Sequence, residues 1–253
     1  MNLPKQSNFS GSDGNSIYGD VQVNVLSAGA CKGLFTALAN TEFRKQMLSF
    51  SGSFGAVGAM QEKLLSGEDC DLLVLTLPLL EQLAAQGKVR ADSIAVIGVV
   101  GTGVAVRAGS QWPNVSTANL LGANLLAARG IHFPDPARAT AGVHFARVLS
   151  ELGIAAKVAG VCHHYPNGAA AMAALAADSR PLQMGCTQIS EILYTPGIEL
   201  VAELPAPFSL ATRYAAALTR DCSNVEASAR MMAILTGAQS ASLRVAGGFQ
   251  SPK

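Results

Sequence analysis

The segment that decides the fold is residues 21–38, VQVNVLSAGACKGLFTAL. Apolar residues alternate as far as Leu26, small residues follow at 27–30, and leucines at helical spacing begin with Leu34 and Leu38. This pattern predicts a strand that turns through small residues into a helix. Backbone N–H groups at such a turn, together with the helix dipole, favour the binding of an anion. To form a binding pocket, other segments of the chain would have to surround this turn.

The composition limits the function classes. With 253 residues, of which 49% are hydrophobic and 14% charged, the chain is long enough for one large α/β domain or two smaller lobes with cores of their own. The formal net charge is +1, and the Lys and Arg residues are scattered rather than clustered. These features argue against a nucleic acid or an anionic membrane as a partner.

The cysteines predict neither a metal site nor a disulfide framework. They form no CxxC pair, none has the spacing of metal ligands, and their number is odd. Such a set is typical of small buried residues in a reducing compartment. We expect no metal and no cofactor; one disulfide is compatible with the sequence, but no pattern indicates it. The five residues are Cys31, Cys70, Cys162, Cys186 and Cys222.

Residues 1–20 are polar and rich in Ser, Gly and Asn, which predicts a flexible tail. The tail lacks the apolar region of a signal peptide. No window of the chain approaches the roughly 18–20 uninterrupted apolar residues of a membrane span. We therefore expect no membrane span and, for the sequence as written, a cytoplasmic location. A start codon further upstream would instead make the protein periplasmic.

Strands and helices are predicted to alternate along the chain. The alternation favours βαβ units and a mostly parallel sheet with helices on both faces. The predicted strands are residues 21–26, 47–53, 71–76, 131–133, 155–161, 182–187 and 198–204. The predicted helices are residues 31–43, 57–65, 78–87, 140–152, 169–177, 225–235 and 239–245, with a further short helix capped by Ser116 or Thr117.

Two long apolar segments do not fit this alternation. Residues 93–106 contain Gly98, Gly101 and Gly103 and are too long for one ordinary strand. The glycines suggest a bend or a crossing between two lobes. Residues 210–218 form a second apolar segment, which is suited to return the chain to the first lobe.

Five predicted strand-to-helix turns are candidates for a ligand site. Ligands of open α/β sheets bind beyond the carboxyl ends of the strands, where these turns lie. Four of the five turns are rich in Gly, Ala, Ser or Thr, which allows backbone donors to approach a ligand closely. Each single turn is also an ordinary feature of a βα unit, so only their convergence would indicate a site. The turns are residues 27–31, 53–57, 135–140, 165–169 and 187–190.

A series of motifs resembles the periplasmic molybdate-binding proteins, which are substrate-binding proteins of ABC transporters with the type II periplasmic-binding-protein fold. The resemblance covers about residues 21–248. It rests on LSAGA at 26–30, SFG at 53–55, GEDCDLLVL at 67–75, GVAVRAG at 103–109, PDPARATAGVHFA at 134–146, GCTQISEIL at 185–193 and PGIEL at 196–200.

The resemblance implies two α/β lobes that close on a small anion, joined by hinge segments at 101–106 and 210–215. It implies one lobe of residues 21–103 and 211–253 and a second lobe of residues 104–210. The expected partners are the anion and the membrane component of an ABC transporter, and the expected state is a monomer.

The resemblance also assigns the ligand loops by position. Molybdate-binding members typically offer serine hydroxyls in the first two loops and a tyrosine in the last. This chain has Ala30, then Ala56 or Val57, and finally Gln188 at these places, so the ligand would be held mainly by backbone amides. The full set of expected ligand-binding residues is Ser27, Ala30, Cys31, Ala56, Val57, Arg138, Thr140, Asn167, Gly168 and Gln188.

Arg138 bears on the choice of ligand. Its guanidinium would suit the two oxygens of a carboxylate, which favours an organic acid over a metal oxyanion. The alternative is that Arg138 is an ordinary solvated surface residue.

An isomerase of unsaturated organic acids, similar to aconitate isomerase, is the alternative function on the same scaffold. Such a reaction needs a base within reach of the substrate. Glu191 suits the first turn of a helix, and the other candidates fit surface or structural roles as well as catalytic ones. Because no catalytic dyad is visible, binding is favoured and the catalytic residues stay unassigned. The other candidates are Cys31, Lys32, His163, His164 and Tyr165, while His132 and His144 fit structural roles.

Overall fold

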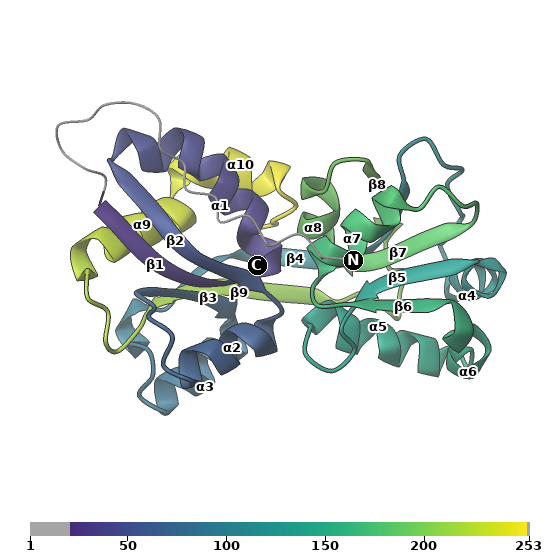
Figure 1. Cartoon of the computed structure of the whole chain (residues 1–253), viewed down its shortest axis with the longest axis horizontal. Coiled ribbons are helices and arrows are strands. Elements are labelled where there is room, and N and C mark those ends of the chain that lie inside the picture. The colour runs from purple at the N-terminus through teal and green to yellow at the C-terminus, as the bar shows by residue number, and fades with distance from the viewer. Residues whose placement is uncertain (1–20, 252–253) are drawn as a thin grey trace, which may run out of the picture.

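The computed structural model describes residues 21–251, so the tail predicted at 1–20 lies outside the described residues. The described part folds into two α/β lobes that lie side by side (Figure 1). The strands are β1 Val21–Ala28, β2 Leu48–Gly55, β3 Leu72–Thr76, β4 Ala95–Arg107, β5 Gly130–Pro134, β6 Cys162–Tyr165, β7 Gln183–Gln188, β8 Ile198–Glu203 and β9 Ala211–Leu218. The helices are α1 Lys32–Leu38, α2 Val57–Leu65, α3 Leu77–Ala85, α4 Ala118–Ala127, α5 Thr140–Glu151, α6 Ala155–Val158, α7 Gly168–Ala177, α8 Ile189–Tyr194, α9 Val225–Thr236 and α10 Ala241–Ala246.

The strands form one continuous mixed sheet in the order β2-β1-β3-β9-β4-β7-β5-β6, with β8 paired to β4. In the first lobe, β1 is parallel to β2 and β3, and β9 is antiparallel to β3. In the second lobe, β5 is parallel to β6 and β7. The expected mixed sheet with parallel βαβ units is confirmed: four strand pairs are parallel, and β4, β8 and β9 take part in four antiparallel pairs.

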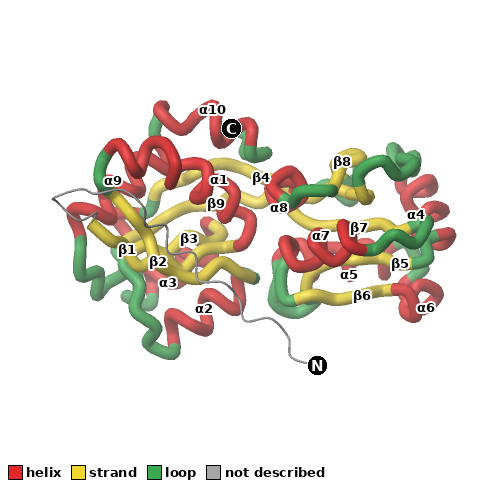
Figure 2. The backbone as a smooth tube through the Cα atoms, turned by 45° about the horizontal axis from the view of Figure 1, so that its top comes forward, coloured by secondary structure: helices red, strands yellow, loops and turns green. Residues whose placement is uncertain are grey.

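The strand β4 crosses from one lobe to the other. Its first part pairs with β9 as far as Gly101, and from Thr102 onward it pairs with β7 and β8. The predicted crossing is confirmed, and the segment predicted to be too long for an ordinary strand is a single strand of 13 residues. The chain returns from β8 to β9 through residues 204–210, which gives the two-segment connection visible in Figure 2. The lobe boundaries at 103/104 and 210/211 stay a prediction.

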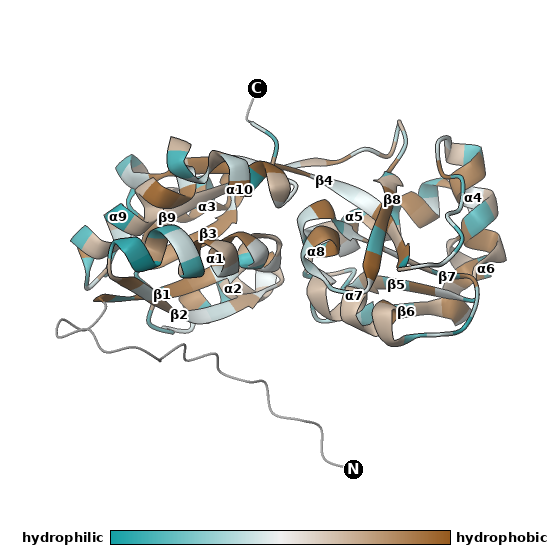
Figure 3. Ribbon diagram, turned by 90° about the horizontal axis from the view of Figure 1, so that it is seen from above, coloured by the Kyte–Doolittle hydropathy of each residue, from teal (hydrophilic) through white to brown (hydrophobic). Residues whose placement is uncertain are grey.

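Helices cover both faces of the sheet in each lobe. In the first lobe, α1 and α9 pack on one face of β1 through Val23 and Val25, while α2 and α3 pack on the other face around Leu26. This split follows from the two-residue period of a strand. In the second lobe, α4, α5 and α6 share one core, and α7 and α8 share another. Figure 3 shows hydrophilic residues on α9 and α4, at the two far ends of the molecule.

One predicted element was wrong. Residues 155–161, predicted as a strand, form α6 and a 3-10 turn, and the strand is β6, which follows them. The two alanines that open the segment favour a helix, and a short apolar run does not separate the two periods. The strand-to-helix turn predicted at 187–190 leads into α8, for which no bounds were predicted because its six residues span less than two turns.

Two further expectations concern disulfide bonds and membrane-spanning helices. Within the described residues all five thiols are free; Cys31, Cys186 and Cys222 are buried and the other two are half-buried. None of the helices between residues 21 and 251 combines the length and the apolar content that crossing a bilayer requires.

Candidate functional site

All five strand-to-helix loops meet at one small cavity between the lobes, which we call the interlobe cavity. Its volume is about 20 Å³, close to the space that one water molecule needs. A larger ligand therefore requires the lobes to move apart before it can enter. The cavity is lined by Ala28, Gly29, Ala30, Gly55, Ala56, Val57, Pro134, Ala139, Thr140, Ala141, Asn167, Gly168, Gln188, Glu191 and Tyr214.

Two helices of opposite lobes begin at the cavity without a side-chain cap. The residue before α2 is Ala56 and the residue before α5 is Ala139, and neither makes a capping hydrogen bond through its side chain. The first-turn N–H groups of a helix lack partners within the helix and carry partial positive charge. The two helix starts therefore direct hydrogen-bond donors at the interlobe cavity from two sides, which suits an anion.

The start of α7 differs, because the protein fills it with its own groups. The side chain of Asn167 caps α7 by accepting a hydrogen bond from the N–H of Ala170 at 2.9 Å. The N–H groups of Gly168 and Ala169 face the carboxyl group of Glu191, which comes from α8, and lower its pKa. The third helix start at the cavity is therefore already occupied by a carboxylate.

Glu191 is the charged residue of the interlobe cavity and is 5% exposed. Its Oε2 accepts a hydrogen bond from Thr187 Oγ1 at 2.6 Å, and the N–H of Gln188 donates to the carboxylate as well. Burial raises the pKa of Glu191, and the surrounding donors offset this rise only in part. A carboxyl group in such a place is suited to proton transfer or to selection among ligands.

Gln188 and Tyr214 complete the polar lining. The Nε2 of Gln188 donates to Thr212 Oγ1 at 3.2 Å, and its Oε1 is buried without a hydrogen-bond partner. Burial raises the pKa of the Tyr214 hydroxyl, and the nearby Glu191 raises it further, so the phenol is neutral. The cavity thus offers amide donors from the helix starts together with two side-chain acceptors, the carboxylate of Glu191 and Oε1 of Gln188.

The structure brings seven of the ten expected ligand residues to the cavity and leaves three outside its lining. Ser27 is buried and its hydroxyl donates to the carbonyl of Ala28 at 3.1 Å. Cys31 is buried, and burial together with the charge of Glu191 raises the pKa of its thiol, which rules out a reactive thiolate. The seven lining residues are Ala30, Ala56, Val57, Thr140, Asn167, Gly168 and Gln188.

Arg138 lies at the junction of the lobes, outside the cavity lining. Its guanidinium is half-exposed and forms an ion pair with Glu62 of α2 in the other lobe. Its carbonyl accepts a hydrogen bond from the N–H of Gly58 at 3.1 Å. The residue therefore links the two lobes in this closed arrangement.

Sequence reasoning passed over the role of Glu191 and did not single out Tyr214. Glu191 stands three residues after Gln188, the spacing at which a helix-start glutamate normally folds back on its own helix. Its contacts to another helix could not be read from that spacing. Tyr214 is the polar member of an otherwise apolar segment, which was the available signal for it.

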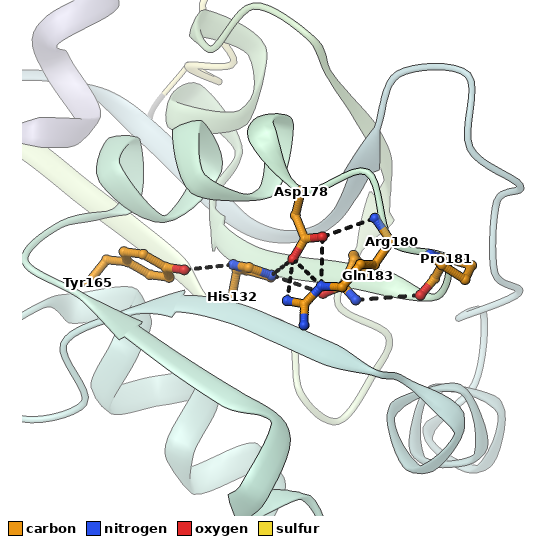
Figure 4. Close-up of polar contacts among 6 residues, drawn as sticks. All are labelled: His132, Tyr165, Asp178, Arg180, Pro181 and Gln183. Carbon is orange, nitrogen blue, oxygen red and sulfur yellow. Dashed lines mark hydrogen bonds and ion pairs between the residues drawn. The ribbon is translucent and has the colours of Figure 1, made fainter.

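A second polar cluster lies in the second lobe around His132 (Figure 4). Its ring bonds the hydroxyl of Tyr165 at 2.9 Å and the side chain of Gln183 at 3.1 Å. Asp178, which follows α7, pairs with Arg180, and this contact holds the pKa of Asp178 well below its usual range. Burial lowers the pKa of His132. The cluster ties β5, β6 and the end of α7 together, in line with the structural role expected for His132.

Comparison with known proteins identifies the family of this chain. The family described as bacterial extracellular solute-binding protein matches residues 23–250, almost the whole chain. The chain belongs to this family. The sequence resemblance and the two-lobed fold of type II periplasmic binding proteins are thereby confirmed.

Solved structures of this fold include proteins named for oxyanions. The periplasmic molybdate-binding protein of Azotobacter vinelandii aligns with a TM-score of 0.75 and 18% identity, over 91% of this chain and 100% of that one. The sulfate-binding protein of Mycobacterium tuberculosis aligns with a TM-score of 0.67 and 15% identity, over 91% of this chain and 86% of that one. At these identities the likeness establishes the fold alone.

A curated relative is an enzyme. The aconitate isomerase of a Pseudomonas species is 27% identical over 188 residues, which cover 72% of this chain and 68% of that protein. Both functions considered from the sequence therefore have a counterpart among similar proteins.

Proposed function

We propose that this protein binds a small anion between its two lobes and holds it by the backbone amides at the starts of α2 and α5. The observation that carries the proposal is the pair of uncapped helix starts from opposite lobes that face one cavity. Binding at such a place joins the lobes, so the ligand stabilises the closed form. An oxyanion and an organic carboxylate both fit these donors.

Membership in the solute-binding family supports a role in uptake, in which the closed, loaded form delivers its ligand to the membrane component of an ABC transporter. The location and the monomeric state expected from the sequence are also parts of this proposal.

A thermal-shift panel tests the binding function. Molybdate, tungstate, sulfate, phosphate and a set of small mono-, di- and tricarboxylates are added to the full chain, each in large excess. A ligand at about 100 times its Kd stabilises the folded state by about 2.7 kcal/mol, which raises the Tm of a chain of this size by roughly 5–10 °C. If none of these anions raises the Tm, the proposed function is wrong.

Val57→Asp provides a matched variant for the same assay. Val57 is the first residue of α2 and lines the interlobe cavity. An aspartate there suits the helix dipole, but its charge competes with the ligand for the same amides. Because Val57 also packs against the two cores of the first lobe, a melting curve without ligand checks that the variant is folded. The anion-induced rise in Tm should therefore disappear. Val225→Asp, at the exposed start of α9, is the control and should keep the full rise.

Isomerisation of an unsaturated acid is a second candidate, which the buried carboxyl of Glu191 favours. Moving a double bond requires that a proton leave one carbon and return to another, and one carboxyl group can accept it and give it back. The conversion of cis- to trans-aconitate, followed by NMR, tests this candidate. The reaction should occur with the natural chain and cease in Glu191→Gln; no conversion by the natural chain would exclude it.

A further inference from the structure

The carboxylate of Glu191 is wedged between the two lobes. A Cβ atom placed at Gly29 of the first lobe would lie 2.7 Å from Glu191 Oε1, and a Cβ at Gly168 of the second lobe would overlap Oε2. The absence of a side chain at these two glycines therefore makes room for the carboxylate. The protein places a negative charge at the wall of a cavity whose other walls suit anions.

The polar groups nearest the Glu191 carboxyl are donors. Thr187 Oγ1 and the N–H groups of Gly168, Ala169 and Gln188 point at it. A carboxyl group surrounded in this way is held as the acceptor, because a protonated acid would have to donate one hydrogen itself. The carboxylate thus fills the donor cradle at the start of α7, which a ligand would otherwise use.

Among the described residues, no Lys or Arg side chain forms an ion pair with the Glu191 carboxylate. The residues that line the interlobe cavity include no Lys and no Arg, and within residues 21–251 no ion pair involves Glu191. The titratable groups that face it are Cys31, before α1, and Tyr214 of β9. From α7 and β7 it meets only amides and the Thr187 hydroxyl.

Helix α1 also packs against α8, and the Nζ of its Lys32 lies over the Tyr194 ring, 6.0 Å from the ring centroid. The remaining strands packed against α8 are β4 and β8. Their charged residues are engaged elsewhere or lie at the strand ends: Glu199 accepts a hydrogen bond from Trp112, Glu203 accepts one from Gln250, and Arg107 ends β4. The charge of Glu191 is therefore felt by any anion that enters the cavity.

A second acceptor points to the same ligand chemistry. Gln188 is 2% exposed and lines the cavity, and its Oε1 has no hydrogen-bond partner. A buried acceptor that stays unpaired costs free energy, so a ligand that supplies a hydrogen to it is favoured.

We propose that Glu191 selects the ligand: the cavity takes an anion that also carries an O–H group, which donates to Glu191, and it rejects fully deprotonated oxyanions. The candidate ligands are hydroxy acids and hydrogen-bearing oxyanions such as hydrogen phosphate. This inference rests on the proposed anion-binding function and specifies its ligand class.

Matched pairs of anions provide the test, with affinities measured by isothermal titration calorimetry on the full chain. Hydrogen phosphate and sulfate have the same shape, but only phosphate carries an O–H near neutral pH. Glycolate and acetate differ by one hydroxyl. The O–H member of each pair that binds should do so at least roughly 100-fold more tightly, because its partner leaves a buried acceptor unpaired.

Glu191→Gln should largely remove the preference for the anion that carries an O–H group. Its amide group can donate as well as accept and carries no charge, so the affinity for sulfate or acetate should rise and each ratio should fall to within roughly tenfold. Glu226→Gln, on the exposed start of α9, is the control and should keep the ratios of the natural chain. A melting curve of each variant checks that it is folded.

The natural chain supplies a further readout that needs no variant. Sulfate does not titrate near neutral pH, so its affinity should rise as the pH falls only because Glu191 takes up a proton and becomes a donor. Equal binding of both members of each pair, or sulfate binding that is independent of pH, would overturn the inference and leave anion binding intact. If neither hydrogen phosphate nor glycolate binds while a fully deprotonated oxyanion of the thermal-shift panel does, the inference falls and anion binding stands; failure of every anion in both experiments would overturn both.

Discussion

Asp71 joins the first strand of the chain to the start of α9. It is 3% exposed, and its carboxylate accepts hydrogen bonds from the N–H of Asn24 at 2.9 Å and from the N–H and hydroxyl of Ser223, both at 2.8 Å. Burial alone would raise its pKa, but these hydrogen bonds together outweigh that effect and lower it. The ionised form is therefore stabilised by the fold.

Asp71→Ala should lower the free energy of unfolding by about 3 kcal/mol, since several buried donors lose a charged acceptor. Because the pKa of Asp71 is lower in the folded chain, its contribution is complete above about pH 4 and is lost as the pH falls through the folded pKa. Urea unfolding at neutral and acid pH measures this. Asp69→Ala, two residues away and exposed, should change stability little; equal losses in the two variants would contradict the role of Asp71.

The residues of the site were predictable to the extent that they are backbone donors. The loops at Ala30, Val57 and Thr140 follow from strand-to-helix patterns, and the structure brings them together. Arg138 and Glu191 show the limit of such reasoning. Whether Arg138 turns toward the ligand or toward Glu62, and which helix start Glu191 meets, depends on packing between residues far apart in the sequence.

At the scale of elements, the start of α5 depends on a glycine. A Cβ atom at Gly142 would overlap the carbonyl oxygens of Pro134 and Asp135, which belong to the loop that leads into α5. The first turn of α5 therefore packs directly on the backbone of this loop. That contact holds the amides of Thr140 and Ala141 at the cavity.

Gly142→Ala should force the loop and the helix apart, with a loss of about 1–3 kcal/mol of stability and a clear loss of anion affinity. Gly122→Ala in α4 is the matched control, because its nearest neighbour is Leu152 at an ordinary 3.6 Å. It should be neutral or stabilise the chain by up to about 1 kcal/mol through helix propensity. Chemical denaturation and the thermal-shift assay distinguish the two variants. Gly142→Ala should lower the free energy of unfolding, whereas Gly122→Ala should leave it unchanged or raise it. A Gly142→Ala variant as stable as the natural chain would contradict the packing argument.

The elements that sequence patterns predicted well are long or strongly apolar. Strand β3 and helix α5 have clear periods and are confirmed within one residue at each end. The errors lie where elements are short. Helices α6 and α8 have four and six residues, so their position is decided by the neighbours they pack against rather than by their own periodicity.

At the scale of the whole molecule, the two lobes meet at α8, whose Ile189 packs into the first-lobe core and whose Tyr194 lies against Gly33, and at the junction of α2 with the loop before α5. The ion pair between Arg138 and Glu62 joins α2 to the loop before α5, beside the hydrogen bond from Gly58 to the Arg138 carbonyl. Exposed ion pairs are worth about 0–1 kcal/mol, so this one adjusts the balance between open and closed forms without fixing it.

Arg138→Ala and Glu62→Ala should therefore each weaken anion binding by no more than about fivefold. The double variant should be no weaker than either single variant, because both remove the same contact. Calorimetric titration of the three variants checks this. A loss of roughly 100-fold or more in Arg138→Ala alone would contradict the role given to the ion pair and show that the guanidinium contacts the ligand, as the sequence first suggested.

Amide chemical shifts measured by NMR during an anion titration test the central claim most directly, because they report where the ligand is held. We expect the largest changes at Val57, Thr140 and Ala141, with a plateau that indicates a single site. Changes confined to the open hollow beside Arg44 and Lys45 on the outer surface, with none at the interlobe cavity, would contradict the account.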